Sequence, residues 1–260
     1  MDLINRGKKC FLLENGQGRF SVFYKQQMLG FVEIYENEFH NRNCYVKVEL
    51  KKYGTILAIE LFDLLQKHIK RPLQVMISSM EEEKIAFLEK SGFQCKRKCY
   101  ELNVTANSLR DIENVIFEGK SVYTEYNDTF VQCLKGSEEY DLCARFLYEY
   151  YAKVHEAINP LTASYEVFRK QLPEEVYYDC IKGEIFHVAF VEENEIAYVG
   201  SEDKNAFKRF IIDVVLNLFM KYKELFFECD DCDEAAMMLQ SLFAVEVNES
   251  YNTYVREWDI

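Results

Sequence analysis

The stretch that decides the fold is Lys84-Ile85-Ala86-Phe87-Leu88-Glu89-Lys90-Ser91-Gly92-Phe93. Residues 81–90 are typical of a helix, and the glycine that follows is typical of a helix end, because glycine adopts the left-handed conformation at low cost. Phe93 then opens a strand-like run that continues to Val104. The stretch therefore predicts a short helix that leads through a glycine into one or two closing strands.

The residues upstream of this helix predict a longer helix enclosed between strands. Leu57, Leu61 and Leu65 recur at helical spacing, and the pattern stops before Pro72, because proline disfavours helical geometry in the residue that precedes it. The expected elements are strands near Arg19–Tyr24, Leu29–Tyr35 and Cys44–Val48, a helix over Thr55–Ile69 and a buried strand over Leu73–Ile77.

The same order of elements returns in the second half of the chain. A shift of 152 residues places Ile59 on Ile211 and Leu73 on Leu225 without a gap. Because element order and spacing agree together, the pattern favours a duplication. The expected elements are strands over Val176–Cys180, Glu184–Val191, Glu195–Val199, Leu225–Glu228 and Tyr251–Arg256, and helices over Asn205–Tyr222 and Asp233–Leu242.

The second copy is longer at its front. A strand over Thr129–Leu134 and helices over Glu138–Ile158 and Thr162–Gln171 precede it, and Asn114–Gly119 is a candidate extra strand. We therefore expect an α+β protein with an N-terminal repeat over residues 1–104, a linker over residues 105–128 and a C-terminal repeat over residues 129–260. Each repeat should hold a mixed, mostly antiparallel sheet flanked by helices.

The composition and the charge narrow the class of protein. Hydrophobic residues make up 49% of the 260 residues, yet no run of 18 apolar residues occurs, so we expect no membrane span. Nine cysteines without a spacing framework and no secretory signal indicate reduced thiols in a cytoplasmic protein. A net charge of −13 argues against a nucleic-acid partner, because binding to phosphates needs surplus Lys and Arg.

The charge is unevenly distributed. Residues 1–104 carry a net charge of +4 and residues 105–260 a net charge of −17. The first half is therefore the better candidate for an anionic ligand, with ordinary solubilising acidity of the second half as the alternative interpretation.

The opening stretch resembles a diagnostic segment of the GNAT superfamily of acyl-CoA N-acyltransferases. The family pattern is N-x-x-A-x-x-[LF]-Y-x-K-x-G-F. The matching positions are Phe87, Lys90, Gly92 and Phe93, whereas Glu81, Lys84 and Leu88 replace the Asn, Ala and Tyr. The resemblance covers about residues 10–104 and, more faintly, residues 129–260, and it implies two tandem GNAT folds.

A second segment, Val46-Lys47-Val48-Glu49-Leu50-Lys51-Lys52-Tyr53-Gly54-Thr55-Ile56, resembles the family loop V-x-P-x-x-[RQ]-x-x-G-x-[GA], which binds the pyrophosphate of acyl-CoA. Val48 and Ile56 depart from it at the Pro and the last Gly/Ala positions. The resemblance implies acetyl-CoA or another acyl-CoA as co-substrate. The implied binding residues are Val46, Val48, Lys51, Lys52, Tyr53, Gly54 and Thr55.

The physics of this loop supports an anion site. The first turn of a helix has unpaired N–H groups and a partial positive charge, which attract phosphate. Gly54 lets a ligand approach the backbone, Lys51 and Lys52 add charge, and the Thr55 hydroxyl is a hydrogen-bond donor. A plain turn before a helix is the alternative interpretation of Gly54.

The second copy departs further from the family pattern. The shift of 152 residues replaces Gly54 by Ala206, Lys51 by Asp203 and Gly92 by Ala244. Acidic residues at this loop repel phosphate. We therefore expect the second copy to have lost ordinary CoA binding.

The resemblance implies a general base for the acceptor amine and a tyrosine that protonates the departing thiolate. Leu88 and Gln240 occupy the two tyrosine positions, so Tyr53 is our candidate acid, with Tyr45 as a substitute. Glu33 is the candidate base and Glu36 its substitute. An ordinary solvated carboxylate is the alternative interpretation of both.

The remaining polar motifs predict no metal site. The four histidines show no catalytic spacing, and Cys229-Asp230-Asp231-Cys232 lacks the second cysteine pair that zinc sites normally need. The acceptor is expected to be a small-molecule or peptide amine, and a cationic one would suit the acidic second half. The alternative function is a catalytically silent tandem GNAT that binds a ligand or a partner protein. The acyl chain and the oligomeric state stay open.

Overall fold

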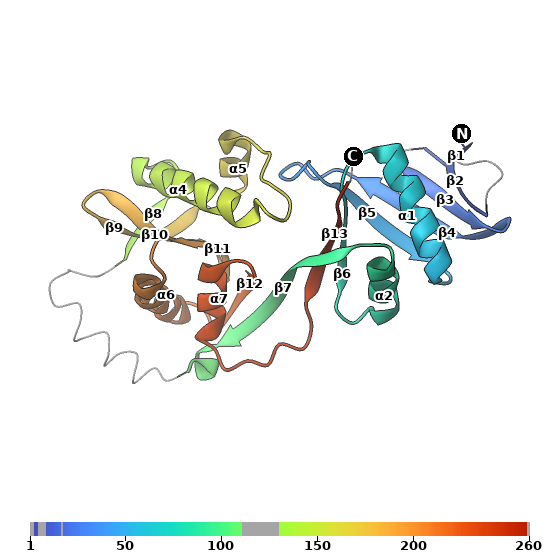
Figure 1. Cartoon of the computed structure of the whole chain (residues 1–260). Coiled ribbons are helices and arrows are strands. Elements are labelled where there is room, and N and C mark those ends of the chain that lie inside the picture. Colours follow the sequence, from blue (N-terminus) through green and yellow to red (C-terminus); the bar gives the residue numbers. More distant parts are fainter. Residues whose placement is uncertain (1–2, 5–8, 17, 111–129, 259–260) are drawn as a thin grey trace. The chain divides into compact units, whose positions relative to one another are not determined.

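A computed structural model describes residues 3–4, 9–16, 18–110 and 130–258. The chain forms two compact units (Figure 1). Unit 1 comprises Met1–Lys98, His155–Ala163 and Glu249–Ile260, and unit 2 comprises Cys99–Val154 and Ser164–Asn248. Both units therefore contain segments that are distant from each other in sequence.

Unit 1 is built on a mixed, mostly antiparallel sheet. Its strand order is β1-β2-β3-β4-β5-β6-β13-β7, in which only the neighbours β5 and β6 are known to run parallel. The elements are β1 (Leu3–Ile4), β2 (Cys10–Glu14), β3 (Arg19–Tyr24), β4 (Gln27–Tyr35), β5 (Cys44–Leu50), α1 (Thr55–Ile69), β6 (Leu73–Ser78), α2 (Glu82–Lys90), β7 (Gln94–Thr105) and β13 (Tyr251–Arg256).

The ends of these elements follow from local chemistry. Lys25 and Gln26 have positive φ angles of 49° and 66°, which gives the β3–β4 hairpin a two-residue turn of the type that matches strand twist. Helix α1 ends at Lys70 in the left-handed conformation. Helix α2 ends before Gly92, whose φ angle is 85°, so the glycine at the C-terminal end of this helix is confirmed.

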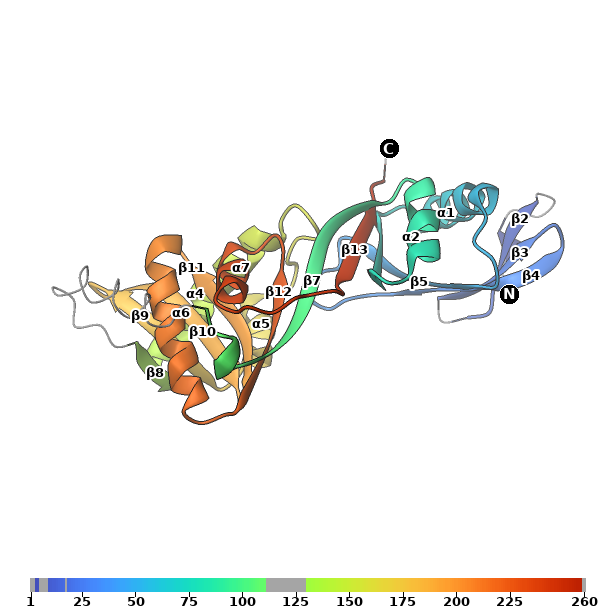
Figure 2. The ribbon, with the colours of Figure 1, turned by 90° about the horizontal axis from the view of Figure 1, so that it is seen from below.

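Helices α1 and α2 lie on the same face of this sheet (Figure 2). Leu57, Leu61 and Leu65 of α1 and Phe87 and Leu88 of α2 are buried in one core with the strands. The helical spacing seen in the sequence is therefore the buried face of α1.

Unit 2 repeats the plan with additional helices. Its strand order is β7-β12-β11-β10-β9-β8; α4 and α5 lie on one face of the sheet and α6 and α7 on the other (Figure 1). The elements are β8 (Val131–Leu134), α4 (Glu138–His155), α5 (Tyr165–Gln171), β9 (Glu175–Ile181), β10 (Glu184–Glu192), β11 (Glu195–Ser201), α6 (Lys204–Phe219), β12 (Glu224–Asp230) and α7 (Glu234–Ser241), with the 3₁₀ turn η1 (Ala106–Ser108) after β7.

The structure confirms two tandem repeats of one α+β fold. The shift of 152 residues carries β5 onto β11, α1 onto α6, β6 onto β12 and α2 onto α7, with ends that agree within about one turn of helix. In both units the strand before the long helix runs parallel to the strand after it.

The last strand of each predicted repeat, β7 or β13, pairs with a strand of the other repeat. Strand β13, at the end of the chain, lies between β6 and β7 in unit 1. Residues 99–105 of β7 pair with β12 of unit 2. The predicted ranges 1–104, 105–128 and 129–260 are consecutive stretches, whereas the compact units exchange strands between them. Most of the predicted linker, including Asn114–Gly119, lies outside the described residues.

No helix in the described part of the chain is both long and apolar enough to cross a membrane.

The exchange of β13 yields a prediction about stability. Tyr254 on β13 is 4% exposed and belongs to the core of unit 1. Replacing Tyr254 by Ala should lower the free energy of unfolding by about 3–5 kcal/mol, as for other large buried side chains. Amide hydrogen exchange should then increase in β6, the pairing partner of β13, before it increases in β9 and β10. The control is Tyr251→Ala on the same strand, where the side chain is half exposed; earlier exchange in β9 and β10 would contradict the assignment of β13 to unit 1.

Candidate functional site

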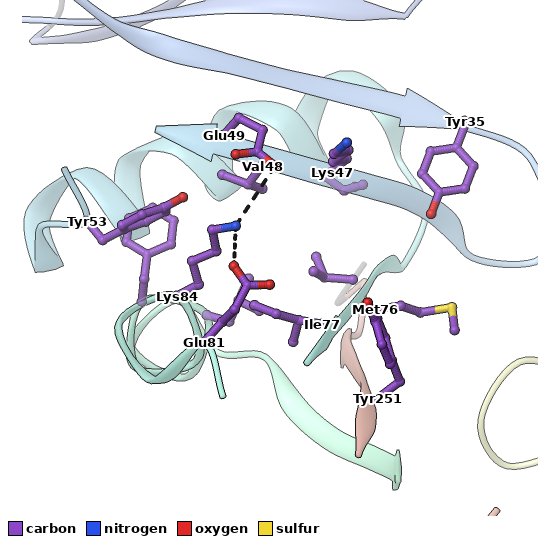
Figure 3. A pocket seen from close by; sticks show the side chains of 14 residues that line it. Tyr35, Lys47, Val48, Glu49, Tyr53, Met76, Ile77, Glu81, Lys84 and Tyr251 are labelled. Carbon is purple, nitrogen blue, oxygen red and sulfur yellow. Dashed lines mark ion pairs between the residues drawn. The ribbon is translucent and has the colours of Figure 1, made fainter. Parts of the chain in front are cut away.

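The candidate site of unit 1 lies where two neighbouring strands part. Strands β5 and β6 are in register only at Cys44↔Leu73 and Tyr45↔Gln74. A cavity of about 230 Å³ opens beyond this point. Residues 46–49 of β5, residues 75–77 of β6, helix α2 and Tyr53 supply most of its wall (Figure 3).

The open edge of β5 presents backbone donors to this cavity. The Lys51 N–H donates to the Leu29 carbonyl on the β4 side (2.8 Å), and the Cys44 N–H donates to the Pro72 carbonyl on the β6 side (2.8 Å). The N–H groups of successive residues point alternately to the two edges of a strand. The N–H groups of the even-numbered residues of β5 therefore point toward β6. The Val48 N–H therefore faces the gap, beyond the last residue pair with β6.

The loop after β5 leads to an uncapped helix end. Gly54 is the N-cap residue of α1, no side chain accepts a hydrogen bond from the first turn, and this turn contains no acidic residue. Lys51 and Lys52 are exposed just before it. Among the described residues, no side-chain cap satisfies the first turn of α1, so its partial positive charge is available to an anion. The side chains of Thr55 and Ile56 lie outside the described residues.

Packing within the chain does not require a glycine at position 54. Its φ angle of −102° is ordinary for any residue. A Cβ atom built on Gly54 would meet no atom within 4 Å. The space beside its backbone is thus open, as the approach of a ligand would require.

An ion-pair bridge crosses one end of the cavity. Lys84 on α2 reaches to Glu81 and also lies 3.9 Å from a carboxylate oxygen of Glu49 on β5 (Figure 3). Burial alone would lower the pKa of Lys84, but the hydrogen bond with Glu81 and the nearby charges raise it above the usual value. Lys84 is therefore a cation at neutral pH. Its side chain fills part of this end of the cavity.

Tyr53 lies at the same end of the cavity. Its hydroxyl accepts a hydrogen bond from the Leu50 N–H (3.3 Å), and its ring meets that of Phe87 edge-on at 5.2 Å. Burial raises the pKa of the Tyr53 phenol, although the Leu50 N–H and Lys84 oppose the shift. The group is therefore protonated at neutral pH and able to donate a proton.

The other end of the cavity is apolar and open. Tyr35 of β4, Met76 of β6 and Tyr251 of β13 line it and are 47%, 41% and 48% exposed. Burial raises the pKa of the Tyr35 phenol. Tyr251 comes from the exchanged strand, so the C-terminal segment of the chain supplies a wall of this cavity.

The structure brings together only part of the residues proposed from the sequence. Val46, Val48 and Tyr53 line the cavity, whereas Lys51, Lys52, Gly54 and Thr55 lie on or just after the loop that precedes α1. Glu33 lies on β4, in register with Lys47, and is not among the described residues that line the cavity.

The two substitute residues are engaged elsewhere. The Tyr45 hydroxyl accepts a hydrogen bond from the Asn159 amide (3.3 Å), and Glu36 forms an ion pair with Arg71 (2.7 Å). Sequence reasoning missed the reach of Lys84 and the contribution of Tyr251. The replacement of the family alanine was a visible signal for Lys84, but no local pattern shows where β13 pairs.

Aromatic side chains pack against the corresponding strand in unit 2. Strands β11 and β12 are in register only at Glu195↔Phe226. A Cβ atom on Gly200 of β11 would lie 3.2 Å from the ring of Tyr150 and 3.3 Å from that of Phe146, both from α4. The rings of Tyr150 and Phe146 thus pack against the backbone of β11 at Gly200, next to the place where β11 and β12 part.

Tyr150 is fixed there by Asp233, the N-cap residue of α7. The Tyr150 hydroxyl donates to the Asp233 carboxylate at 2.6 Å, and this carboxylate also accepts from the backbone N–H groups of Ala235 and Ala236. Burial and the neighbouring carboxylate raise the pKa of the Tyr150 phenol. Burial also raises the pKa of Asp233, against the opposing effect of its three donors.

The long helix of unit 2 has an anionic residue at its beginning. The Asp203 carboxylate accepts a hydrogen bond from the Ala206 N–H (3.4 Å) in the first turn of α6. A negative side chain thus accepts from the first turn of α6, whereas the residue directly before α1 is Gly54, which has no side chain. Phosphate is disfavoured at this end by charge and by the occupied donor.

The CxxC motif is packed into unit 2. Cys229 is buried, its sulfur lies 3.4 Å from that of Met237, and burial raises the pKa of its thiol to about 12. A thiol with a raised pKa is a poor metal ligand at neutral pH. The described part of the chain contains no cluster of three metal-ligating side chains.

Comparison with known proteins supports the fold. A GCN5-related N-acetyltransferase from Sphaerobacter thermophilus superposes with a TM-score of 0.51 at 11% identity, covering 95% of this chain and 83% of that one. At this identity the likeness concerns the fold alone, and it confirms the GNAT fold expected from the sequence.

Two further solved structures align along most of the chain, each with a TM-score of 0.47 and 9% identity. They are a GNAT-family acetyltransferase from Colwellia psychrerythraea, with 92% of this chain and 85% of that one covered, and a tandem GNAT protein from the clavulanic acid biosynthesis pathway, with 93% and 83% covered. No protein-family model matches the sequence. No curated protein matches it at a significant level.

The Tyr150–Asp233 contact yields the second prediction. Tyr150→Phe keeps the ring in the strand gap but removes the hydrogen bond to a carboxylate, so it should lower the free energy of unfolding by about 1.5–3 kcal/mol. Urea denaturation measures the change. Tyr251→Phe, at a half-exposed position of unit 1, should change it by less than about 0.5 kcal/mol. Equal losses in both variants would show that the contact with Asp233 has no special importance.

Proposed function

We propose that this protein is an N-acyltransferase that moves an acyl group from acyl-CoA to an amine, with the donor bound in unit 1. The observation that carries the proposal is the difference between the two strand gaps. The gap in unit 1 is an open cavity beside a helix end without a side-chain cap, whereas in unit 2 Tyr150 packs on β11 and donates to Asp233, and Asp203 accepts from the first turn of α6.

The open edge of β5 suits the extended arm of an acyl-CoA. Its amide and thioester carbonyls need donors, and the Val48 N–H is directed into the cavity. The diphosphate would lie at the N-terminus of α1, near Lys51 and Lys52, where the helix dipole and two exposed cations favour anions. Lys84 must turn aside, or itself bind the arm, because its side chain reaches across to Glu49.

The reaction is aminolysis of a thioester. The neutral amine attacks the thioester carbonyl, the C–N bond forms as the C–S bond breaks, the nitrogen loses one proton and the CoA thiolate gains one. A backbone donor such as the Val48 N–H stabilises the negative charge that develops on the carbonyl oxygen. Tyr53, neutral at physiological pH, is our candidate for the proton donor.

The candidate proton acceptor lies outside the described cavity wall. Glu33 is our candidate base, and it lies beside Lys47 on the neighbouring strand rather than in the cavity wall. It would therefore act through a water molecule. We propose a reducing compartment such as the cytoplasm as the place of action, because all nine cysteines are thiols.

A silent binding protein is the second candidate function, and two observations favour it. Leu88, at the position of the family tyrosine, is 2% exposed in the core. Lys84 occupies part of the cavity through its ion pairs. A protein that binds acyl-CoA, yet releases no thiol with any of a broad set of primary amines, would belong to this class.

Gly54 provides the third prediction and the principal test of the donor site. Gly54→Val should abolish the rise in melting temperature that acetyl-CoA causes in the wild type, because a branched side chain blocks the approach of the diphosphate. The substitution should cost the unliganded protein no more than about 1 kcal/mol, since the position is open.

The matched control is Ala206→Val, at the equivalent position of the second repeat. It should retain the acetyl-CoA shift. If Ala206→Val removes the shift and Gly54→Val keeps it, the donor site lies in unit 2 and the proposal is wrong in its main point.

Tyr53 provides the fourth prediction. Tyr53→Phe should reduce the rate of thiol release by about 10²–10⁴-fold without changing the acetyl-CoA melting shift, because general acid catalysis contributes on that order. Tyr35→Phe, which alters a hydroxyl at the other end of the same cavity, should keep most of the rate. An unchanged rate in Tyr53→Phe would remove this residue from the mechanism.

A further inference from the structure

The cavity of unit 1 has two chemically different ends. One end contains Tyr53 and the ion pairs of Lys84, close to the helix N-terminus that we assign to the diphosphate. The other end contains Tyr35, Met76 and Tyr251. If the donor enters along the first end, the second end is the side from which the other substrate reaches the thioester.

The second end offers flat apolar surface rather than charge. In Figure 3, Tyr35 and Tyr251 point toward the opening from opposite sides, and Met76 lies beside Tyr251. Two aromatic rings and a thioether provide surfaces against which another ring can stack, and a methionine side chain adapts to its shape. These three side chains stay between 41% and 48% exposed, so they form an open mouth rather than an enclosed tunnel.

The charges around this mouth are scattered and of both signs, so they give little attraction for a polycation. Lys47 lies in the cavity wall on the β5 side, and it is exposed. Glu33 is in register with Lys47 on β4, and Glu36, one residue after β4, is paired with Arg71. Glu49 and Glu81 are near Lys84 at the far end. Among residues 105–260, Glu249 lies near the mouth, where it accepts a hydrogen bond from Ser78, the register partner of Tyr251; the mouth thus holds isolated charges rather than an acidic cluster.

We propose that the Tyr35–Met76–Tyr251 mouth is the acceptor subsite and selects a small amine that carries an aromatic ring. The proposal rests on the proposed acyl transfer in unit 1. It assigns to the exchanged strand β13 a role in substrate choice, because Tyr251 contributes one of the two rings. The ring of the acceptor lies among the three side chains, and its amine points toward the Val48 end of the gap.

The test is a calorimetric titration of the full chain, saturated with CoA, with phenethylamine, butylamine and spermidine. Phenethylamine should bind about tenfold more tightly than butylamine, because only phenethylamine has an aromatic ring that can stack on Tyr35 and Tyr251. Tyr251→Ala should remove this preference, and Tyr251→Phe, which keeps the ring, should retain it. Met80→Ala, at a 69% exposed position that does not line the cavity, is the control and should bind like the wild type.

Tighter binding of spermidine, or a phenethylamine preference that survives Tyr251→Ala, would overturn the proposal. A Tyr251-dependent preference for hexanoyl-CoA over acetyl-CoA, without one for phenethylamine, would also overturn it, since the mouth would then hold an acyl chain. The acetyl-CoA melting shift separates the two failures. If the shift is present and the amine preference is absent, only the subsite proposal fails. If the shift is absent, acyl transfer fails, and the titration repeated without CoA decides the subsite.

Discussion

The pairing of β5 with β6 is the constraint on which the site of unit 1 depends. These parallel strands are in register for two residue pairs and then diverge. Divergence leaves donors and acceptors of two strand edges without their usual partners, and buried backbone groups need partners. A cavity at this point is therefore polar along its walls, even though the side chains around it are largely apolar. An extended ligand with amide groups can form the backbone hydrogen bonds that an additional strand would form at this place.

The two repeats meet this constraint in different ways. Unit 1 leaves the gap open, with only the Lys84 ion pairs across one end. Unit 2 brings Tyr150 and Phe146 against Gly200, and the Tyr150 hydroxyl is held by the Asp233 carboxylate. The second arrangement places a packed contact beside the gap where unit 1 has an open cavity.

Local chemistry made much of the fold predictable from the sequence. The strands over Arg19–Tyr24 and Tyr251–Arg256 and the helix over Thr55–Ile69 have the expected bounds. Their ends depend on turn residues and on hydrophobic periodicity, both of which are visible in a single sequence. Strand β2 was missed, because Cys10-Phe11-Leu12-Leu13-Glu14 does not alternate between apolar and polar residues although Cys10 and Leu12 are fully buried.

Pairing over long distances in sequence was not predictable in the same way. The pattern of Tyr251–Arg256 predicts a strand, but it does not identify β6 as the partner. Strands pair through backbone hydrogen bonds, which form whatever the side chains are. The same limit applied to the site. Charge and motif pointed to Lys51 and Lys52, which are exposed, whereas Glu49 and Lys84 meet only because helix α2 returns across the end of β5.

The strand exchange links the chemistry of the first repeat to the second. In an isolated first repeat, β6 would lose the partner strand that contributes Asn252, Thr253 and Tyr254, all buried, to unit 1. The cavity would also lose the ring of Tyr251. The second repeat thus supplies structure and one wall to the open site of unit 1. The pairing of β13 with β6 requires only a strand of the right length and burial, and none of the features of the donor loop.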